Sequence, residues 1–272
     1  MKKNKAVTLH KANELTRGGD GLSVHAKRCL NAIYYIIQKN LEQGINKREL
    51  EIAEFIIISF PFLRKMMHLE KTESYIKEIE DALKELQETT IQLNNFKHPK
   101  TGKVFQWYSM SFLSDTGWKL ENGKKMAYIS IAPLMKWIMI NTHTNGNFTE
   151  LELIPIVNKL KTKYAMKIYE YLKSFETYKF LDITQKHLMK LLGLKEDHKT
   201  YKNYSALKRL LNRQLKEIAK KTDLKEVRLI DNSLLAKGKI YRIVVNPKGK
   251  NKSVSQKEVK ETIDKLLQKF KF

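Results

Sequence analysis

The stretch TYKNYSALKRLLNRQLKEIAKKT, residues 200–222, has the periodicity of a helix with two chemically different faces. Residues 200–221 hold seven Lys or Arg against one acid, and Thr200 is the expected N-cap. Such a helix could enter a DNA major groove, or it could be an ordinary surface helix with a solvated basic face. Its apolar residues recur at steps of three and four, which predicts a buried stripe of Tyr204, Leu207, Leu211, Leu215 and Ile218.

The charge of the whole chain supports a polyanionic partner. The 272 residues carry a net charge of +23, from 52 Lys and Arg against 29 Asp and Glu. Residues 156–272 hold 30 of the basic and 12 of the acidic residues, a net of +18, which leaves 22 and 17 for residues 1–155, a net of +5. Nucleic acid and an acidic membrane surface are the two partners that such a balance favours, and the basic function belongs mainly to the second half.

Several classes of protein are excluded by composition. A single cysteine, Cys29, excludes an intramolecular disulfide and a cysteine-based zinc site, and its place on an apolar helix stripe predicts a buried thiol. The basic start MKKNKAVTLH is not followed by the apolar region of a signal peptide. The longest apolar run, residues 55–63, is too short to span a bilayer and contains Pro61. We therefore expect a soluble cytoplasmic protein without a membrane partner.

The first half of the chain predicts one helix-and-sheet domain. Residues 1–22 are polar with a glycine-rich loop, so we expect a flexible N-terminal segment, followed by a first domain over residues 23–140. Its expected elements are a helix that Ser23 caps and that ends near residue 43, a buried strand at 52–59, a short helix at 62–68, a long helix that Thr72 caps and that ends near 88, strands at 90–96, 104–113 and 125–132, and a short helix at 133–140.

The second half repeats this order after a polar linker and connecting strand at residues 141–154. A second domain over residues 155–246 is expected to contain a helix at 155–175, a strand at 180–183, a short helix from Thr184 to the stop at Gly193, the helix at 200–222, and a hairpin of strands 227–230 and 239–246. Residues 247–272 read as a basic linker and a C-terminal amphipathic helix, which docks on the body or binds a partner. The predicted fold is α+β, with two tandem winged-helix domains.

The third helices of the two domains differ in charge. Residues 72–88 hold six acids against two lysines, and phosphates would repel that face. We therefore expect the second domain to be the main DNA reader. The first domain would serve self-association, as a homodimer, with auxiliary DNA contact through basic loop residues at 97–103.

Residue chemistry assigns roles within the second domain. Arg209 and Arg213 suit guanine edges, and Asn203 or Asn212 suits adenine, with Ser205 on the same face. Lysines are better suited to phosphate contacts that position the protein: Lys202, Lys208 and Lys216. Near the wing tip, Lys237, Lys239 and Arg242 could clamp the DNA backbone or reach a minor groove. Contact with about six phosphates would give a log–log salt slope near −5.

Catalytic patterns are missing from the sequence. No His-x-His pair, no phosphate-binding G-x-x-x-x-G-K-[ST] loop and no Asp-x-Asp pair occurs, so we expect no catalytic residue, no metal ligand and no cofactor. A nuclease or primase is accordingly disfavoured, and double-stranded DNA is the expected partner.

Residues 155–246 resemble the iteron-binding initiators of theta-type plasmid replication, a family built from two winged-helix domains. The resemblance is carried by LKTKYAMKIYEYLKSF (160–175), LMKLLGL (188–194), YKNYSALKRLLNRQLKEIA (201–219) and the strand at 240–245. Residues 23–140 resemble the family only in element order, and Ala219 stands where the family usually has Asn. The residues that match its pattern are Tyr164, Ala165, Tyr169, Glu170, Leu172, Lys173, Gly193, Glu217 and Ile218.

The resemblance implies binding to short direct repeats (iterons) at an origin, melting of nearby DNA, and recruitment of the host initiator and replicative helicase. It also implies a monomer that initiates replication and a dimer, formed through the first domain, that represses its own promoter. DNA binding alone leaves an alternative open, a winged-helix transcriptional repressor without a replication role.

Overall fold

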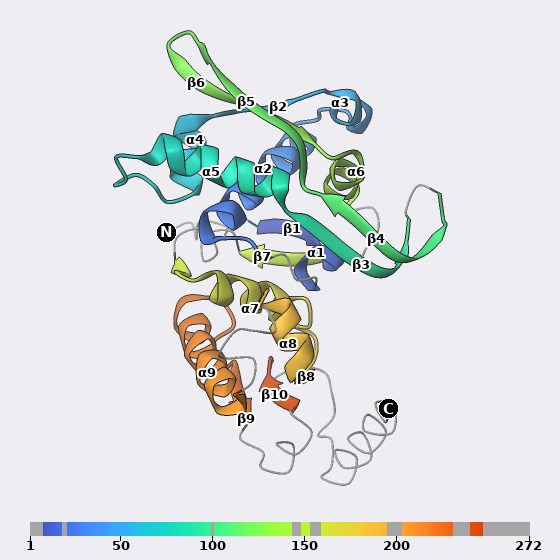
Figure 1. The fold of residues 1–272 in the computed structure, drawn as a ribbon, viewed down its shortest axis with the longest axis vertical. Coiled ribbons are helices and arrows are strands. Elements are labelled where there is room, and N and C mark those ends of the chain that lie inside the picture. Colours follow the sequence, from blue (N-terminus) through green and yellow to red (C-terminus); the bar gives the residue numbers. More distant parts are fainter. Residues whose placement is uncertain are drawn as a thin grey trace.

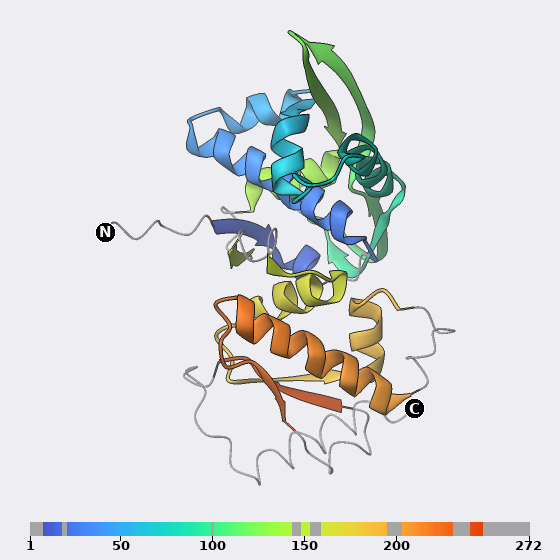
Figure 2. The same ribbon diagram turned by 90° about the vertical axis from the view of Figure 1, so that its left-hand side faces the viewer.

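The computed structural model describes residues 8–17, 21–98, 101–142, 148–152, 159–194, 203–230 and 240–246. Two units of mixed helix and sheet are stacked along the long axis of the molecule, with a small two-stranded sheet between them (Figures 1 and 2). We call residues 21–142 the first unit and residues 159–246 the second unit. No helix in the described part of the chain is long and apolar enough to cross a membrane.

Helices of the first unit largely follow the prediction. Ser23 caps α2 by accepting a hydrogen bond from the Ala26 amide, as expected. The acidic helix begins two residues later than predicted, because Ser74 and not Thr72 precedes its first turn. An unpredicted short helix, α3, follows Asn46, whose side chain caps it. The five helices are α2 (Val24–Glu42), α3 (Lys47–Ile52), α4 (Phe60–Met66), α5 (Tyr75–Glu88) and α6 (Pro133–Asn141).

Sheets of the first unit form a wing and a separate hairpin. β2 (Ile56–Ser59), β6 (Lys124–Ile131) and β5 (Leu113–Glu121) pair in the order β2-β6-β5. Asn122 and Gly123 both have positive φ, at 49° and 73°, which is the geometry of a two-residue hairpin turn and agrees with the predicted turn. Among the described strands, β3 (Thr90–Lys97) and β4 (Val104–Ser111) pair only with each other.

The second unit has the same plan. Its elements are α7 (Lys163–Lys173), β8 (Phe180–Thr184), α8 (Gln185–Leu191), α9 (Tyr204–Lys221), β9 (Arg228–Ile230) and β10 (Ile240–Val244). The sheet order β8-β10-β9 repeats β2-β6-β5, because the strand before the helix pair α4–α5 or α8–α9 pairs with the last strand in both units. This repeat confirms the two tandem winged-helix domains. Helix α7 starts at Lys163, after its N-cap Thr162, and the expected start at 155 lies outside the described residues.

The expected flexible N-terminal segment is wrong for residues 8–17. β1 (Thr8–Ala12) pairs antiparallel with β7 (Phe148–Glu152), and α1 (Asn13–Arg17) continues from it. Leu9, Ala12 and Leu15 are buried, so this segment contributes to the core. The sequence of this segment suggests a polar loop because it contains Lys11. In the structure Lys11 is buried, and its partner, Glu170, lies far along the sequence.

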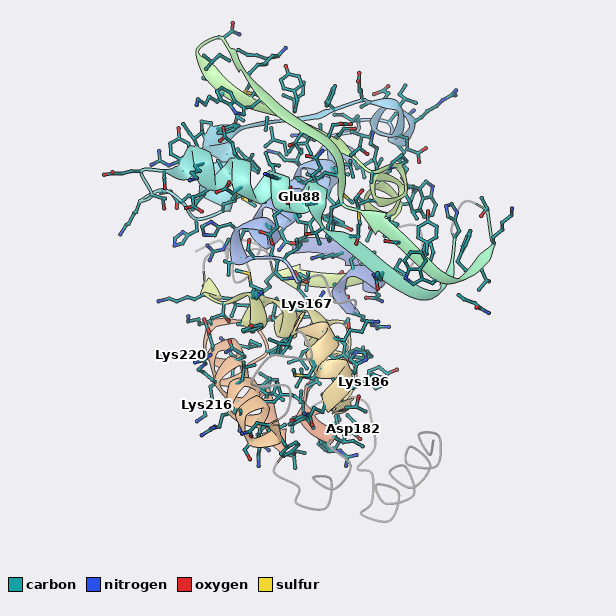
Figure 3. The ribbon with its side chains drawn as sticks, viewed as in Figure 1. Glu88, Lys167, Asp182, Lys186, Lys216 and Lys220 are labelled. Carbon is teal, nitrogen blue, oxygen red and sulfur yellow. The ribbon has the colours of Figure 1, made fainter. Side chains whose placement is uncertain are left out.

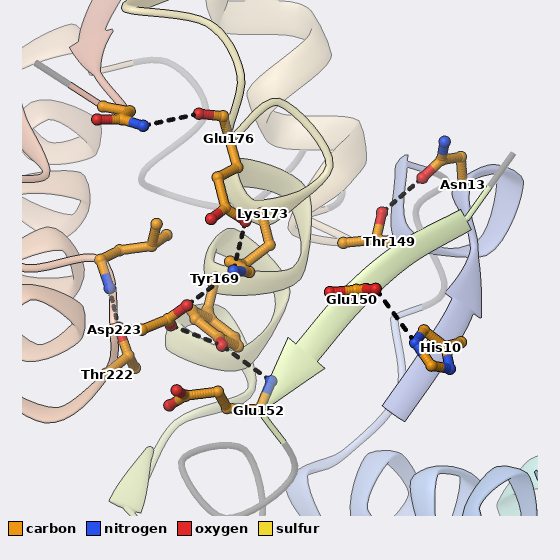
Figure 4. A network of polar contacts seen from close by, with 12 residues as sticks. His10, Asn13, Thr149, Glu150, Glu152, Tyr169, Lys173, Glu176, Thr222 and Asp223 are labelled. Carbon is orange, nitrogen blue, oxygen red and sulfur yellow. Dashed lines mark hydrogen bonds and ion pairs between the residues drawn. The ribbon is translucent and has the colours of Figure 1, made fainter. Parts of the chain in front are cut away.

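Polar contacts of α7 tie the second unit to the small sheet and to helix α1, which lie between the two units. The Lys167 ammonium donates to the Leu15 carbonyl oxygen at 2.8 Å. The Tyr169 hydroxyl accepts from the Glu152 amide of β7 at 3.2 Å and donates to Asp223, just beyond α9, at 2.9 Å (Figure 4). Burial, with Asp223 beside it, raises the pKa of Tyr169, so the phenol stays protonated. Tyr169, one of the family-matching residues on α7, therefore has a structural role. Residues 247–272, including the predicted C-terminal helix, lie outside the described part of the chain.

Candidate nucleic-acid interface

α8 and α9 form the helix-turn-helix of the second unit. The Thr184 hydroxyl caps α8 by accepting from the His187 amide, as predicted. Gly193 ends the helix with a φ of 61°, a left-handed conformation that favours glycine. A Cβ at this position would lie 2.7 Å from Gly21 Cα, in the loop before α2. Gly193 therefore allows both the turn and the close approach of the two units.

One side of α9 is fixed in the core. Leu207, Leu211, Leu215 and Ile218 are almost fully buried, which confirms the predicted apolar stripe. Gln214 is also fully buried, and its Oε1 accepts from the Thr162 hydroxyl at 2.7 Å. These contacts fix the rotation of α9 about its own axis, so the opposite face is presented in one orientation.

The exposed face of α9 is a basic stripe, which consists of Ser205, Arg209, Arg213, Lys216 and Lys220. These residues are three or four positions apart, so the stripe is continuous over about 22 Å at 1.5 Å per residue. None of its four cations makes a side-chain hydrogen bond or ion pair with another residue that the structure describes. Figure 3 shows Lys216 and Lys220 on the outer side of α9. Four uncompensated cations in one row form a surface suited to phosphate oxygens and guanine edges.

The residues on the flanks of the stripe are less available. Asn203, and not Thr200, precedes the helix, and its Oδ1 accepts from the Ala206 amide at 3.0 Å. This oxygen is one of the two atoms that a bidentate adenine contact needs, so the cap competes with the predicted role. Lys208 and Asn212 are half-buried. Thr200 and Lys202 lie outside the described residues.

Arg242 lies in the last described pair before the wing loop, opposite Ile230, but its side chain is engaged with another residue of the sheet. Arg242 lies within β10, where its Nε and Nη2 contact the two carboxylate oxygens of Asp182 on β8 at 2.7 and 2.5 Å. The hydrogen bonds that Arg242 donates to Asp182 raise the pKa of Arg242 above its ordinary value. Both side chains are at most 19% exposed, so this guanidinium is engaged inside the sheet (Figure 3 labels Asp182). Lys237 and Lys239 lie outside the described residues.

The acidic helix α5 of the first unit is tied into its own unit. Glu85 accepts from the Ser23 amide at 2.6 Å, Glu80 from the Trp118 indole at 2.7 Å, and Glu78 lies 3.0 Å from His25. Asp81 and Glu88 remain exposed. Half of the six acids of residues 72–88 therefore serve contacts to α2 and the wing. The acidic helix still differs in charge from the basic helix α9 in the folded chain.

Two further basic residues of the helix-turn-helix, on α8, were missed from the sequence. Lys186 and Lys190 are exposed on α8, one turn apart, while Leu188, Met189 and Leu191 of the same helix are buried. The helical spacing of QKHLMKLL could have indicated both lysines. Within the described ranges, no group of three His, Cys, Asp or Glu residues is arranged to hold a metal ion.

Comparison with known proteins gives the family. Residues 8–173 match the family described as "Initiator Replication protein, WH1". A crystal structure of the Pi initiator protein in complex with iteron DNA is similar over 89% of this chain and 97% of that one, with 16% identity and a TM-score of 0.59. Domains 2 and 3 of RctB give 12% identity and a TM-score of 0.48, over 81% of this chain and 80% of that one. A comparison with curated proteins finds no match. Since the family match covers more than half of its length, the chain belongs to the family of initiator replication proteins.

Proposed function

We propose that this protein is a plasmid replication initiator that binds short direct repeats at an origin through α9. The uncompensated basic stripe on the third helix of the second winged-helix unit carries this proposal. Third helices of helix-turn-helix domains lie in the major groove, with the preceding helix across the backbone. Membership of the initiator family and the fold shared with an initiator solved on iteron DNA support the same placement.

Within the groove, Arg209 and Arg213 have the geometry for bidentate contacts to guanine, because they are exposed, four residues apart and without a carboxylate partner in the described chain. Ser205 and Asn212 would add base-edge contacts near them. Lys208, Lys216 and Lys220, with Lys186 and Lys190 of α8, would contact phosphates. Lys202, Lys237 and Lys239 complete the proposed interface.

Arg242 is a poor candidate for DNA contact. Withdrawing it from Asp182 would leave a largely buried carboxylate without its cation. Asn203 would contact DNA only through its amide nitrogen, because its oxygen caps α9.

Binding to the repeats would lead to melting of the adjacent DNA and recruitment of the host initiator and replicative helicase, as in the family that the sequence resembles. The first unit would carry self-association, and a dimer would repress the protein's own promoter. This function is non-enzymatic and belongs to the cytoplasm. No metal or nucleotide is needed by the protein for the binding step.

Footprinting of the DNA around the gene tests the proposal. We expect protection of direct repeats spaced by about one helical turn, 10–10.5 base pairs, or a multiple of it. Uniform, sequence-independent protection would contradict it.

A transcriptional repressor would also protect an operator, so a second experiment separates the two functions. The gene and its flanking DNA are cloned onto a replicon that lacks an origin. Maintenance of the plasmid, and its loss with Arg213→Ala, is expected for an initiator. A protein that protects the repeats but never supports maintenance is a repressor.

A further inference from the structure

A cleft in the first unit has a chemistry opposite to that of α9. It has a volume of 380 Å³ and lies where α3, the start of α6 and the ends of β5 and β6 meet. Its lining includes Glu51, Ile52, Glu54, Ser114, Lys136 and Trp137. Figures 1 and 2 place α3 well away from α9. A volume near 300–1,000 Å³ is typical of ligand sites in proteins.

The base of the cleft contains a buried cation. Lys136 is 9% exposed, and its ammonium donates to the Ala53 carbonyl oxygen at 2.6 Å, at the C-terminal end of α3. An ammonium has three N–H donors, and no carboxylate of a described residue lies within ion-pair distance of this one. Burial lowers the pKa of Lys136. Buried charges are normally paired, so two donors here are available to an anionic group that enters the cleft.

The wall and the rim differ from the base. Ile52 is 74% exposed at the end of α3, a high value for a branched apolar side chain, and Trp137 lies across the cleft on α6. On the rim, Glu54 is exposed and has no side-chain partner among the described residues, whereas Glu51 contacts the amide of Asn141 at 3.4 Å. In a chain of net charge +23, an acidic rim over an apolar wall is unsuited to DNA and suited to a protein.

We propose that this cleft binds an extended peptide segment of a protein partner, which places a carboxylate on Lys136, an apolar side chain between Ile52 and Trp137, and a basic side chain over Glu54. Each of the three contacts has a complementary feature in the cleft. Beyond the bulge at Ser114, whose carbonyl oxygen already accepts from the Gln87 side chain at 2.9 Å, β5 is an edge strand whose outer side is not paired within the described sheet, which suits an extended chain.

This function is independent of DNA binding, so its failure would leave the proposal for α9 unaffected. Three blocked tripeptides serve as probes: acetyl-Lys-Leu-Glu-amide, acetyl-Lys-Leu-Gln-amide and acetyl-Glu-Leu-Glu-amide. Each is titrated into the full chain while the indole N–H signal of Trp137 is followed by NMR, with Trp137→Phe used for assignment. We expect a saturable shift with the first peptide. Its Gln counterpart should bind about tenfold more weakly, the factor of one charge-assisted hydrogen bond.

Two variants make the test specific. Lys136→Met keeps the length of the side chain and should abolish the preference for Glu over Gln. Glu54→Lys changes an exposed side chain, so folding is not at risk, and it should reverse the preference between Lys and Glu at the first peptide position. Lys84→Met, on exposed α5, is the control and should change neither preference. Equal binding of all three peptides, unchanged preferences in both variants, or no shift of the Trp137 signal would overturn the proposal.

Discussion

The ammonium of Lys11 lies 3.0 Å from a carboxylate oxygen of Glu170, and the two side chains are 2% and 0% exposed. Lys11 belongs to β1 and Glu170 to α7 of the second unit, 159 residues later. Asn31, from α2 of the first unit, lies 3.4 Å from the same ammonium. Three elements thus meet at one buried cation. The N-terminal strand is therefore part of the joint between the two winged-helix units.

Lys11→Met should destabilise the protein by about 3–5 kcal/mol, because it removes the ammonium that lies 3.0 Å from the fully buried Glu170 carboxylate. The double variant Lys11→Met/Glu170→Leu should recover most of this loss, since replacing both members of a buried pair with apolar residues is often neutral. Urea unfolding of the full chain measures both effects.

An exposed ion pair provides the matched control for the variants of the buried pair. Lys84 and Glu88 lie 3.8 Å apart on α5, with side chains 71% and 67% exposed. Lys84→Met should cost less than about 1 kcal/mol. If the double variant Lys11→Met/Glu170→Leu were no more stable than Lys11→Met alone, the loss of stability in Lys11→Met would not come from the Lys11–Glu170 pair.

Cys29 should be unreactive in the folded protein. Its side chain is fully buried on α2, and burial raises the pKa of the thiol to about 12. Since the thiolate is the nucleophile, a thiol reagent at pH 8 should label one cysteine in guanidinium chloride and almost none in native buffer. Native labelling at a rate close to that of the unfolded chain would show that α2 is open to solvent.

Local patterns predicted the elements whose signals are local. The four buried residues of α9 recur at helical spacing within a single stretch, and the caps Ser23 and Thr184 lie next to the helices they begin. The turn at Asn122 and Gly123 needs only these two residues. The exposed row on α9 follows from the same periodicity, so that part of the candidate interface could be found from the sequence.

The parts that were missed depend on distant partners or weak patterns. β5 is an edge strand with mostly exposed side chains, so it shows no alternation of buried and exposed residues. β1 contains a lysine whose partner is in another unit. The partner of Arg242 is also distant in the sequence, because Asp182 precedes it by 60 residues on a neighbouring strand. A charge that is buried by a non-local pair looks in the sequence like a charge available for DNA.

Gly193→Ala should destabilise the second unit and its contact with the first. The left-handed conformation at φ 61° costs a residue with a Cβ about 1–2 kcal/mol, and that Cβ would lie 2.7 Å from the Gly21 backbone. Thermal unfolding measures the loss. Gly44→Ala is the control, because φ there is also positive, at 88°, but no atom lies within 4 Å of the added Cβ. If Gly193→Ala lowers the unfolding temperature more than Gly44→Ala does, the difference measures the cost of the contact with Gly21, separately from the backbone strain.

Arg242→Met should leave affinity for the specific DNA site nearly unchanged, because the guanidinium is held by Asp182. Asp182→Ala should lower the free energy of unfolding, since it leaves that guanidinium largely buried without its partner. Binding isotherms and urea unfolding of the two variants separate these effects. A marked loss of DNA affinity in Arg242→Met, with stability unchanged, would return this residue to the DNA interface.

Arg213→Ala should weaken binding to the specific site by about 1–3 kcal/mol and relax its sequence preference, because an exposed arginine on α9 that has no partner among the described residues is suited to a guanine edge. Lys216→Ala, one turn further along the same row, should instead weaken specific and random DNA alike and reduce the salt slope by about one. Competition binding at several salt concentrations measures both quantities, and Lys84→Met on the first unit is the charge-matched control. Equal losses for Arg213→Ala on specific and random DNA would reduce its role to phosphate contact. In that case sequence recognition would have to come from other residues of the row or from DNA shape.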